Sequence, residues 1–141
     1  MTAHTLPIMQ NIDFPSEAEN IHLVEKLIDN VCEELKIHED HYGNILIALT
    51  EAVNNAIHHG NKLDPNKKTF VACGQALNKL KFRVEDEGKG FDYENLPDPT
   101  DPANLEKPNG RGIFLMKNLA DEISFEENGR IVELTFELSA N

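Results

Sequence analysis

The chain has 141 residues, of which 40% are apolar, and this length and composition suit one globular domain spanning residues 1–141. Its 13 basic and 25 acidic residues give a formal net charge of −12, and so acidic a surface repels the phosphate backbone of nucleic acids while it can attract a basic protein partner. No stretch approaches the roughly 18 consecutive apolar residues of a membrane span, and the N-terminus lacks the features of a signal peptide. We therefore expect a cytoplasmic protein that binds neither nucleic acid nor a membrane.

The first predicted elements are a strand and an amphipathic helix. Residues 8–14 alternate loosely between apolar and polar side chains, which predicts a strand. Ser16 and Glu19 have the spacing of a capping box, so a helix is expected over 16–36. Its apolar residues follow at helical spacing and are Ile21, Val24, Leu27, Ile28, Val31 and Leu35.

A second helix is expected from Glu39–Asp40 to His59, with Gly60 as its C-cap. On a wheel of about 100° per residue, its apolar residues fill one broad arc that would face the core. These residues are Ile45, Leu46, Leu49, Ala52, Val53, Ala56 and Ile57.

The C-terminal half is predicted to contain four strands and a third helix. The strands are expected at 69–77, 79–87, 123–127 and 130–138. Asn128-Gly129 is a strong turn signal between the last two strands, and helical spacing returns with Ile113 and Met116. Residues 92–109 contain four prolines and no apolar period, which predicts a long loop of the kind that often forms a lid.

The predicted order of elements is β-α-α-β-β-loop-α-β-β. Because helices and strands cluster instead of alternating, we expect an α+β fold, a two-layer sandwich with a mostly antiparallel sheet and the helices on one face.

The two cysteines and the paired histidines do not indicate a metal site. Cys32 and Cys73 belong to no CxxC or CxxxH pattern and are expected to be buried or free thiols in a reducing compartment. His58 and His59 are adjacent, so they point to different sides of a helix, and a zinc site is not expected.

Polar residues line one margin of the second helix. Glu51 and Asn55 are four residues apart and therefore stack on one line beside the core arc, with His58 on the same line and His59 nearer the core edge. Taken alone, this line is either a solvated helix flank or one side of a binding site.

Two glycine-rich segments favour a binding site. Asp86 precedes Gly88 and Gly90, where a backbone without side chains can turn sharply or let a ligand approach, and its carboxylate could accept a hydrogen bond from an exocyclic amine. Gly110 and Gly112 open the third helix, whose first turn presents unpaired N–H groups that a phosphate could reach. The chain contains neither the P-loop pattern nor the dinucleotide-binding glycine pattern.

The ordered set of motifs resembles one family. E-x-x-x-N-A-x-x-H-G (51–60), D-x-G-x-G (86–90) and G-R-G-I-F-L-M (110–116) are similar to the N box and the two glycine boxes of the histidine-kinase-like ATPase superfamily, which also holds gyrase. Within it, a short chain with Glu in the N box resembles the bacterial anti-sigma factor serine kinases. The resemblance covers roughly residues 8–138.

The resemblance implies a role for each matching residue. Asn55 would ligate a Mg²⁺ ion that bridges the phosphates of ATP or ADP, and Asp86 would recognise the adenine amine. Glu51 would act as the general base. The remaining candidates for contact with the nucleotide are His59, Gly88, Gly90, Lys107, Gly110, Arg111 and Gly112.

The resemblance also implies partners and leaves three functions open. The first is a protein-serine kinase that phosphorylates an anti-anti-sigma (STAS-type) protein and sequesters a sigma factor, and related proteins are commonly homodimers. The second is a nucleotide-gated binding module without catalysis, since Pro108 and Asn109 occupy the stretch where the sporulation-type kinases place an arginine, with Lys107 and Arg111 the nearest cations. The third, a detached sensor-kinase catalytic domain, is disfavoured because no H-box histidine is evident.

Overall fold

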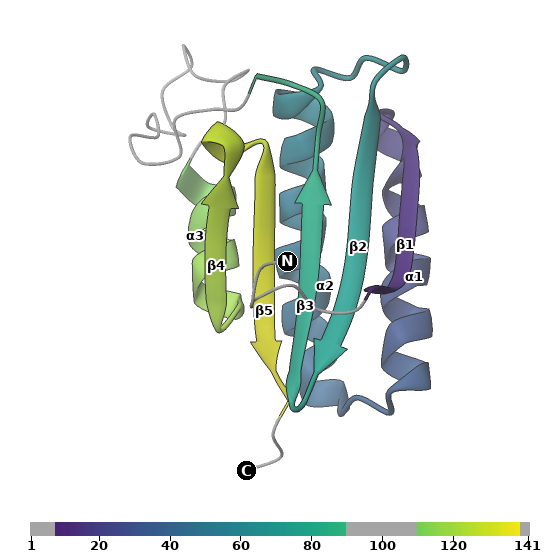
Figure 1. Ribbon diagram of the computed structural model, residues 1–141, viewed down its shortest axis with the longest axis vertical. Coiled ribbons are helices and arrows are strands. Elements are labelled where there is room, and N and C mark those ends of the chain that lie inside the picture. Colours follow the sequence, from purple (N-terminus) through teal and green to yellow (C-terminus); the bar gives the residue numbers. More distant parts are fainter. Residues whose placement is uncertain (1–7, 90–109, 139–141) are drawn as a thin grey trace.

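The computed structural model describes residues 8–89 and 110–138, and in them one five-stranded sheet carries three α-helices on one face (Figure 1). The strands are β1 (Ile8–Pro15), β2 (Lys68–Ala76), β3 (Lys79–Glu85), β4 (Glu122–Glu126) and β5 (Ile131–Glu137). The helices are α1 (Ile21–Glu34), α2 (Glu39–Asn55) and α3 (Gly110–Leu119). The predicted α+β two-layer fold is confirmed, while the loop expected at 92–109 lies outside the described residues.

The sheet has the strand order β1-β2-β3-β5-β4, and each neighbouring pair of these strands is antiparallel. On β3, Leu80, Phe82 and Val84 are buried, and the residues between them point to the other face. Phe82 meets Phe136 of β5 edge-on, with ring centres 6.1 Å apart. These side chains form the layer of the core on which the helices pack.

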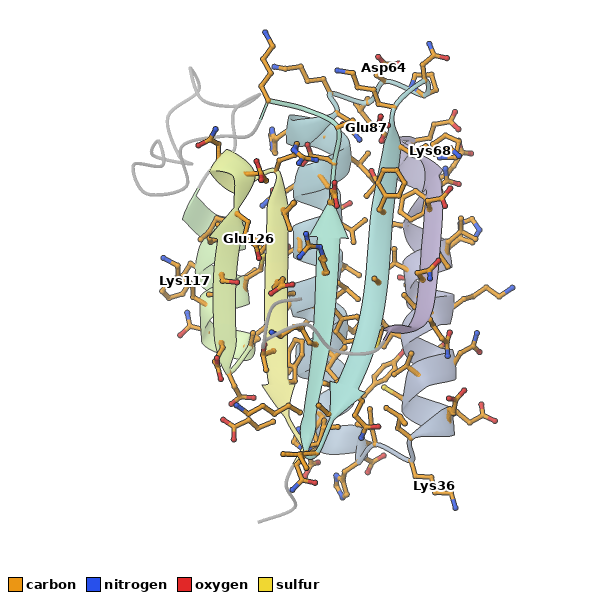
Figure 2. The ribbon with its side chains drawn as sticks, in the orientation of Figure 1. Lys36, Asp64, Lys68, Glu87, Lys117 and Glu126 are labelled. Atoms are coloured by element: carbon orange, nitrogen blue, oxygen red, sulfur yellow. The ribbon has the colours of Figure 1, made fainter. Side chains whose placement is uncertain are left out.

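The face of the sheet away from the helices is charged. Arg83 Nη1 lies 3.0 Å from Glu133 Oε2 and 3.8 Å from Glu126 Oε2. Lys68 Nζ lies 3.3 Å from Asp13 Oδ1, and Figure 2 shows Lys68 and Glu126 near opposite edges of the sheet. Ion pairs between neighbouring strands therefore cover this face of the sheet.

Helix α1 begins later than the sequence predicts. It buries Val24, Leu27, Ile28 and Val31, but it starts at Ile21 after a 3₁₀ turn over Ala18–Asn20. The predicted capping box is wrong, because the Ser16 hydroxyl is buried and donates to the main-chain oxygen of Lys67 at 2.8 Å. Among the helices of 8–89 and 110–138, none is long and apolar enough to cross a membrane.

Helix α2 ends in an unusual turn. Its α-helical part stops at Asn55, and Ala56–Gly60 form a π-helical turn in which the Asn61 N–H donates to Ala56 O at 2.8 Å. The prediction of an α-helix to His59 with Gly60 as C-cap is therefore wrong, since the C-cap is Asn61 and Gly60 is not left-handed. Such single turns are frequent at functional sites.

Candidate functional site

The end of α2 lies directly against the start of α3. Glu51 and Asn55 are one helical turn apart on α2. A Cβ added to Gly112 would lie 3.0 Å from Glu51 Oε2 and 3.6 Å from Asn55 Nδ2. The first turn of α3 comes this close because Gly112 has no side chain, so the structure brings the second glycine box to the polar line of α2.

Within the described part of the chain, one atom of the Asn55 side-chain amide lacks a partner. Its Nδ2 atom is buried and has no hydrogen-bond partner among the described residues. A buried polar group without a partner costs about 1–3 kcal/mol. The unfilled hydrogen-bonding position of Asn55 Nδ2 therefore indicates a binding site, in which a ligand would supply the missing acceptor.

Asp86 follows β3 and is 5% exposed. Its Oδ1 atom accepts a hydrogen bond from the Gly88 N–H at 2.7 Å, which fixes the turn that the first glycine box makes. Burial raises the pKa of Asp86 to about 6, against the opposing effects of the Gly88 N–H and the Arg130 guanidinium. The Gly88 N–H thus holds the carboxylate in one orientation.

The π-helical turn of α2 and the Asp86 turn interlock through two glycines. A Cβ added to Gly60 would lie 2.3 Å from Asp86 Oδ2, and one added to Gly88 would lie 2.0 Å from the main-chain oxygen of Gly60. Both positions therefore exclude side chains, and this explains the glycine that ends the first motif and the glycine that follows Asp86.

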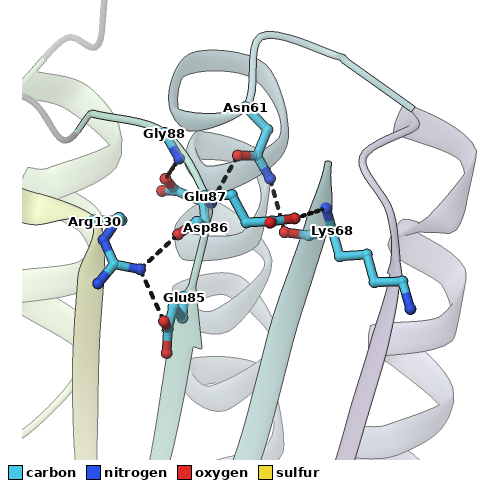
Figure 3. A network of polar contacts seen from close by, with 7 residues as sticks. All are labelled: Asn61, Lys68, Glu85, Asp86, Glu87, Gly88 and Arg130. Atoms are coloured by element: carbon cyan, nitrogen blue, oxygen red, sulfur yellow. Dashed lines mark hydrogen bonds and ion pairs between the residues drawn. The ribbon is translucent and has the colours of Figure 1, made fainter. Parts of the chain in front are cut away.

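Arg130 holds the Asp86 segment from the β5 side, as Figure 3 shows. Its Nη1 atom donates to Asp86 O at 3.0 Å and to Glu85 Oε2 at 2.8 Å, and the Asp86 N–H donates to Arg130 O at 3.1 Å. Arg130 belongs to none of the three sequence motifs. The only available signal was a basic residue placed directly after the Asn128-Gly129 turn.

Asn61 holds the same segment from the other side (Figure 3). It is 1% exposed, and its Oδ1 atom accepts from the Glu87 N–H at 2.8 Å. Its Nδ2 atom donates to Ser16 Oγ at 2.7 Å and to Lys68 O at 2.9 Å. Asn61 was likewise not among the predicted site residues, because it stands one position beyond the first motif.

A pocket with an empty volume of about 290 Å³ lies between α2, α3 and the sheet. Three polar residues, Asn55, Asp86 and Arg130, project into a mainly apolar lining, which is the usual composition of a small-molecule site. The other lining residues are Ala52, Ala56, Val84, Ile113, Met116, Phe125, Gly129 and Val132.

The remaining predicted site residues lie in three places. His58 is exposed and His59 is half-buried, and both belong to the π-helical turn and not to a continuous α-helix. Gly110 begins α3. Gly90, Lys107 and the side chain of Arg111 lie outside the described part of the chain.

The donor set fits a nucleotide with Mg²⁺. A carboxylate accepts hydrogen bonds from an amine such as that of adenine, and an amide oxygen is a suitable ligand for a hard cation. The buried amide nitrogen of Asn55 can donate to a phosphate oxygen, and turning the amide over presents its oxygen to the same space. The N–H groups in the first turn of α3 add an anion site beside it.

Comparison with known proteins identifies the family. The family described as "Histidine kinase-like ATPase domain" matches residues 14–136, and the chain belongs to it. Membership in this family agrees with the resemblance drawn from the three motifs.

Individual bacterial proteins are similar to this chain. The chain is 29% identical over 128 residues to the serine-protein kinase RsbW of Bacillus cereus (strain AH820), an alignment that covers 86% of this chain and 79% of that protein. The serine-protein kinases RsbW of Bacillus anthracis and of Bacillus thuringiensis (strain Al Hakam) match with the same identity and coverage.

A solved structure has the same fold. The crystal structure of the RsbU and RsbW domains of Rv1364c from Mycobacterium tuberculosis matches with a TM-score of 0.64 and 18% identity. The match covers 94% of this chain and 34% of that longer chain. At this identity, the likeness concerns the fold alone.

Proposed function

We propose that the chain is an ATP-dependent protein-serine kinase of the anti-sigma type. It would phosphorylate a serine of an anti-anti-sigma (STAS-type) protein and sequester a sigma factor. The observation that carries this proposal is the buried Nδ2 atom of Asn55, which has no partner among the described residues and lies beside Glu51 and in the same pocket as Asp86. The similarity to the RsbW serine-protein kinases supports it.

The nucleotide would lie between α2, α3 and the end of β3. Asp86 would accept a hydrogen bond from the adenine amine, and Gly88 and Gly90 would leave room for the base and sugar. Asn55 would ligate Mg²⁺, which when bound would neutralise phosphate charge. The remaining contacts to the phosphates and ribose are assigned to His59, Lys107, Gly110, Arg111 and Gly112.

Glu51 would take the proton of the attacking serine hydroxyl. Its carboxylate lies beside the first turn of α3, where the phosphates would bind, so it is within reach of the transferred group. Phosphoryl transfer needs positioning and charge neutralisation more than covalent participation by the protein, and a well-placed base would add to these.

The partners and organisation belong to the same proposal. The net charge of −12 suits a partner with a basic surface. The chain would act in the cytoplasm as one domain over residues 1–141, with residues 92–109 as the lid, and it would form a homodimer as related proteins commonly do.

The test is a phosphorylation assay with two readouts. The chain is incubated with Mg²⁺, γ-labelled ATP and the anti-anti-sigma protein encoded beside it, and ATP binding is measured by calorimetry. Binding together with label on a serine of the partner is the expected result. Absence of ATP binding would refute the proposal.

A non-catalytic switch is the second candidate. One sequence feature favours it: Pro108 and Asn109 precede the second glycine box where the sporulation-type kinases carry an arginine. ATP binding that changes sigma-factor affinity, without label on any cognate partner, would support the switch over the kinase.

A further inference from the structure

We propose that Asn61 is a positioning residue that orients Asp86 and thereby sets the preference for adenine. This inference rests on the proposed nucleotide-binding function and adds to it a residue that lies outside the three sequence motifs.

Asn61 is fixed by its own partners. Its Nδ2 atom donates to Ser16 Oγ at the junction of β1 and α1, and to Lys68 O at the start of β2. Ser16 is fully buried, and its hydroxyl also donates to Lys67 O. The amide plane of Asn61 therefore has one favourable orientation.

In that orientation, the Oδ1 atom of Asn61 accepts from the Glu87 N–H at 2.8 Å, on the residue directly after Asp86. The carboxylate of Glu87 accepts a hydrogen bond from the main-chain N–H of Lys68, the residue whose oxygen accepts from Asn61. Arg130 holds the main-chain oxygen of Asp86 from the opposite side. The peptide that follows Asp86 is thus clamped between two side chains from distant parts of the chain.

Asn61 also links the two halves of the pocket. It directly follows Gly60, whose backbone packs against the Asp86 carboxylate. The same chain segment continues back into α2, which carries Glu51 and Asn55. Asn61 therefore fixes the adenine half of the pocket relative to the half proposed for Mg²⁺ and phosphate.

The network offers its own matched control. The Ser16 hydroxyl contacts Asn61, the Thr69 hydroxyl and the main-chain oxygen of Lys67. Ser16→Ala removes buried hydrogen bonds from this network and should lower stability, but it leaves the contact between Asn61 and Glu87. Asn61→Ala removes that contact as well.

The experiment compares ATP with purine riboside triphosphate, which lacks the 6-amino group. Affinities are measured by calorimetry at pH 8 for the parent, Asn61→Ala and Ser16→Ala. A hydrogen bond to a charged group predicts a preference of the parent for ATP of about 10-fold to 100-fold. Asn61→Ala should lower this ratio to below about threefold, and Ser16→Ala should retain the ratio despite its lower stability.

If Asn61 had a structural role alone, Asn61→Ala would lower the affinities for ATP and for purine riboside triphosphate equally, and the ratio of the two affinities would stay unchanged. A preserved ratio in Asn61→Ala would overturn the positioning role and leave the proposed function intact, whereas a parent that binds neither nucleotide would overturn both. If Asn61→Ala fails to fold, hydrogen exchange in the parent decides the question: a protected Glu87 amide is expected, and exchange at the rate of an open amide would refute the clamp.

Discussion

Gly60 lies so close to the carboxylate of Asp86 that position 60 has no room for a side chain. A methyl group on Gly60 would lie 2.3 Å from Asp86 Oδ2 and 2.8 Å from Asp86 Oδ1. The carboxylate cannot swing aside without losing the Gly88 N–H, and its main chain is tied to Arg130. The end of α2 and the Asp86 turn are therefore one packed unit.

Gly60→Ala should disturb both stability and binding. The added methyl group must displace Asp86 or the π-helical turn, so we expect a loss of about 1–3 kcal/mol in the free energy of unfolding and a loss of ATP affinity. Gly43→Ala, in the α-helix that precedes the π-helical turn, is the matched control, because nothing lies within 4 Å of its added Cβ. It should stabilise by about 0.5–1 kcal/mol. Equal unfolding midpoints for Gly60→Ala and the parent would show that the contact is not tight.

Asn55→Ala should lower the affinity for Mg-ATP with little or no loss in the stability of the fold. The substitution removes a buried amide nitrogen that has no partner among the described residues, so the nucleotide-free protein should lose little stability or gain up to about 1 kcal/mol. Affinity for Mg-ATP should fall at least about tenfold, because the substitution removes the proposed Mg²⁺ ligand, the amide oxygen, and a possible hydrogen-bond donor to phosphate, the amide nitrogen. Asn54→Ala, one position away, is the control. Unchanged Mg-ATP affinity in Asn55→Ala would remove Asn55 from the metal site.

Asp86 should give stability a distinct pH dependence. Its pKa rises from the ordinary 3.8 to about 6, so the folded protein holds the proton more tightly than the unfolded chain. The stabilisation by protonation is therefore fully present below about pH 4 and is lost as the pH rises through 6. Between pH 5 and pH 7 the parent should lose about 1 kcal/mol relative to Asp86→Asn. Urea unfolding at several pH values measures this difference, and parallel profiles would contradict it.

Glu51→Gln should slow phosphoryl transfer while ATP binding stays unchanged. Glutamine keeps the shape of the side chain but cannot take the serine proton, so single-turnover transfer should fall by roughly 10²–10⁴-fold. Glu33→Gln, on the exposed side of α1, is the control. Transfer by Glu51→Gln at the rate of the parent would exclude Glu51 as the base.

The fold was predictable where local periodicity determines it. The spacing of Val24, Leu27, Ile28 and Val31 predicts the buried face of α1, and alternation along β3 predicts its buried residues. The elements carrying Glu51, Asn55, Asp86 and the second glycine box were likewise predictable, because the three motifs fall at distinct element ends.

The supporting contacts were not predictable, because they join residues far apart in the sequence. Asn61 contacts Glu87 across 26 positions, and Arg130 contacts Asp86 across 44. The capping role predicted for Ser16 was wrong for the same reason, because its hydroxyl donates to Lys67 O, which lies 51 positions away. No pattern within one element reveals such partners.

The π-helical turn makes the number of residues in the backbone a determinant of the pocket. A π turn holds one residue more than an α-helical turn. Deleting one residue of 57–59 would turn the bond from the Asn61 N–H to Ala56 O into an ordinary α-helical bond, so Gly60 and Asn61 would keep nearly their present places relative to Ala56. An insertion has no such outlet, because the turn already holds its extra residue. The segment between Asn55 and Asn61 should therefore tolerate substitution at exposed positions such as His58, and it should tolerate a single deletion far better than an insertion.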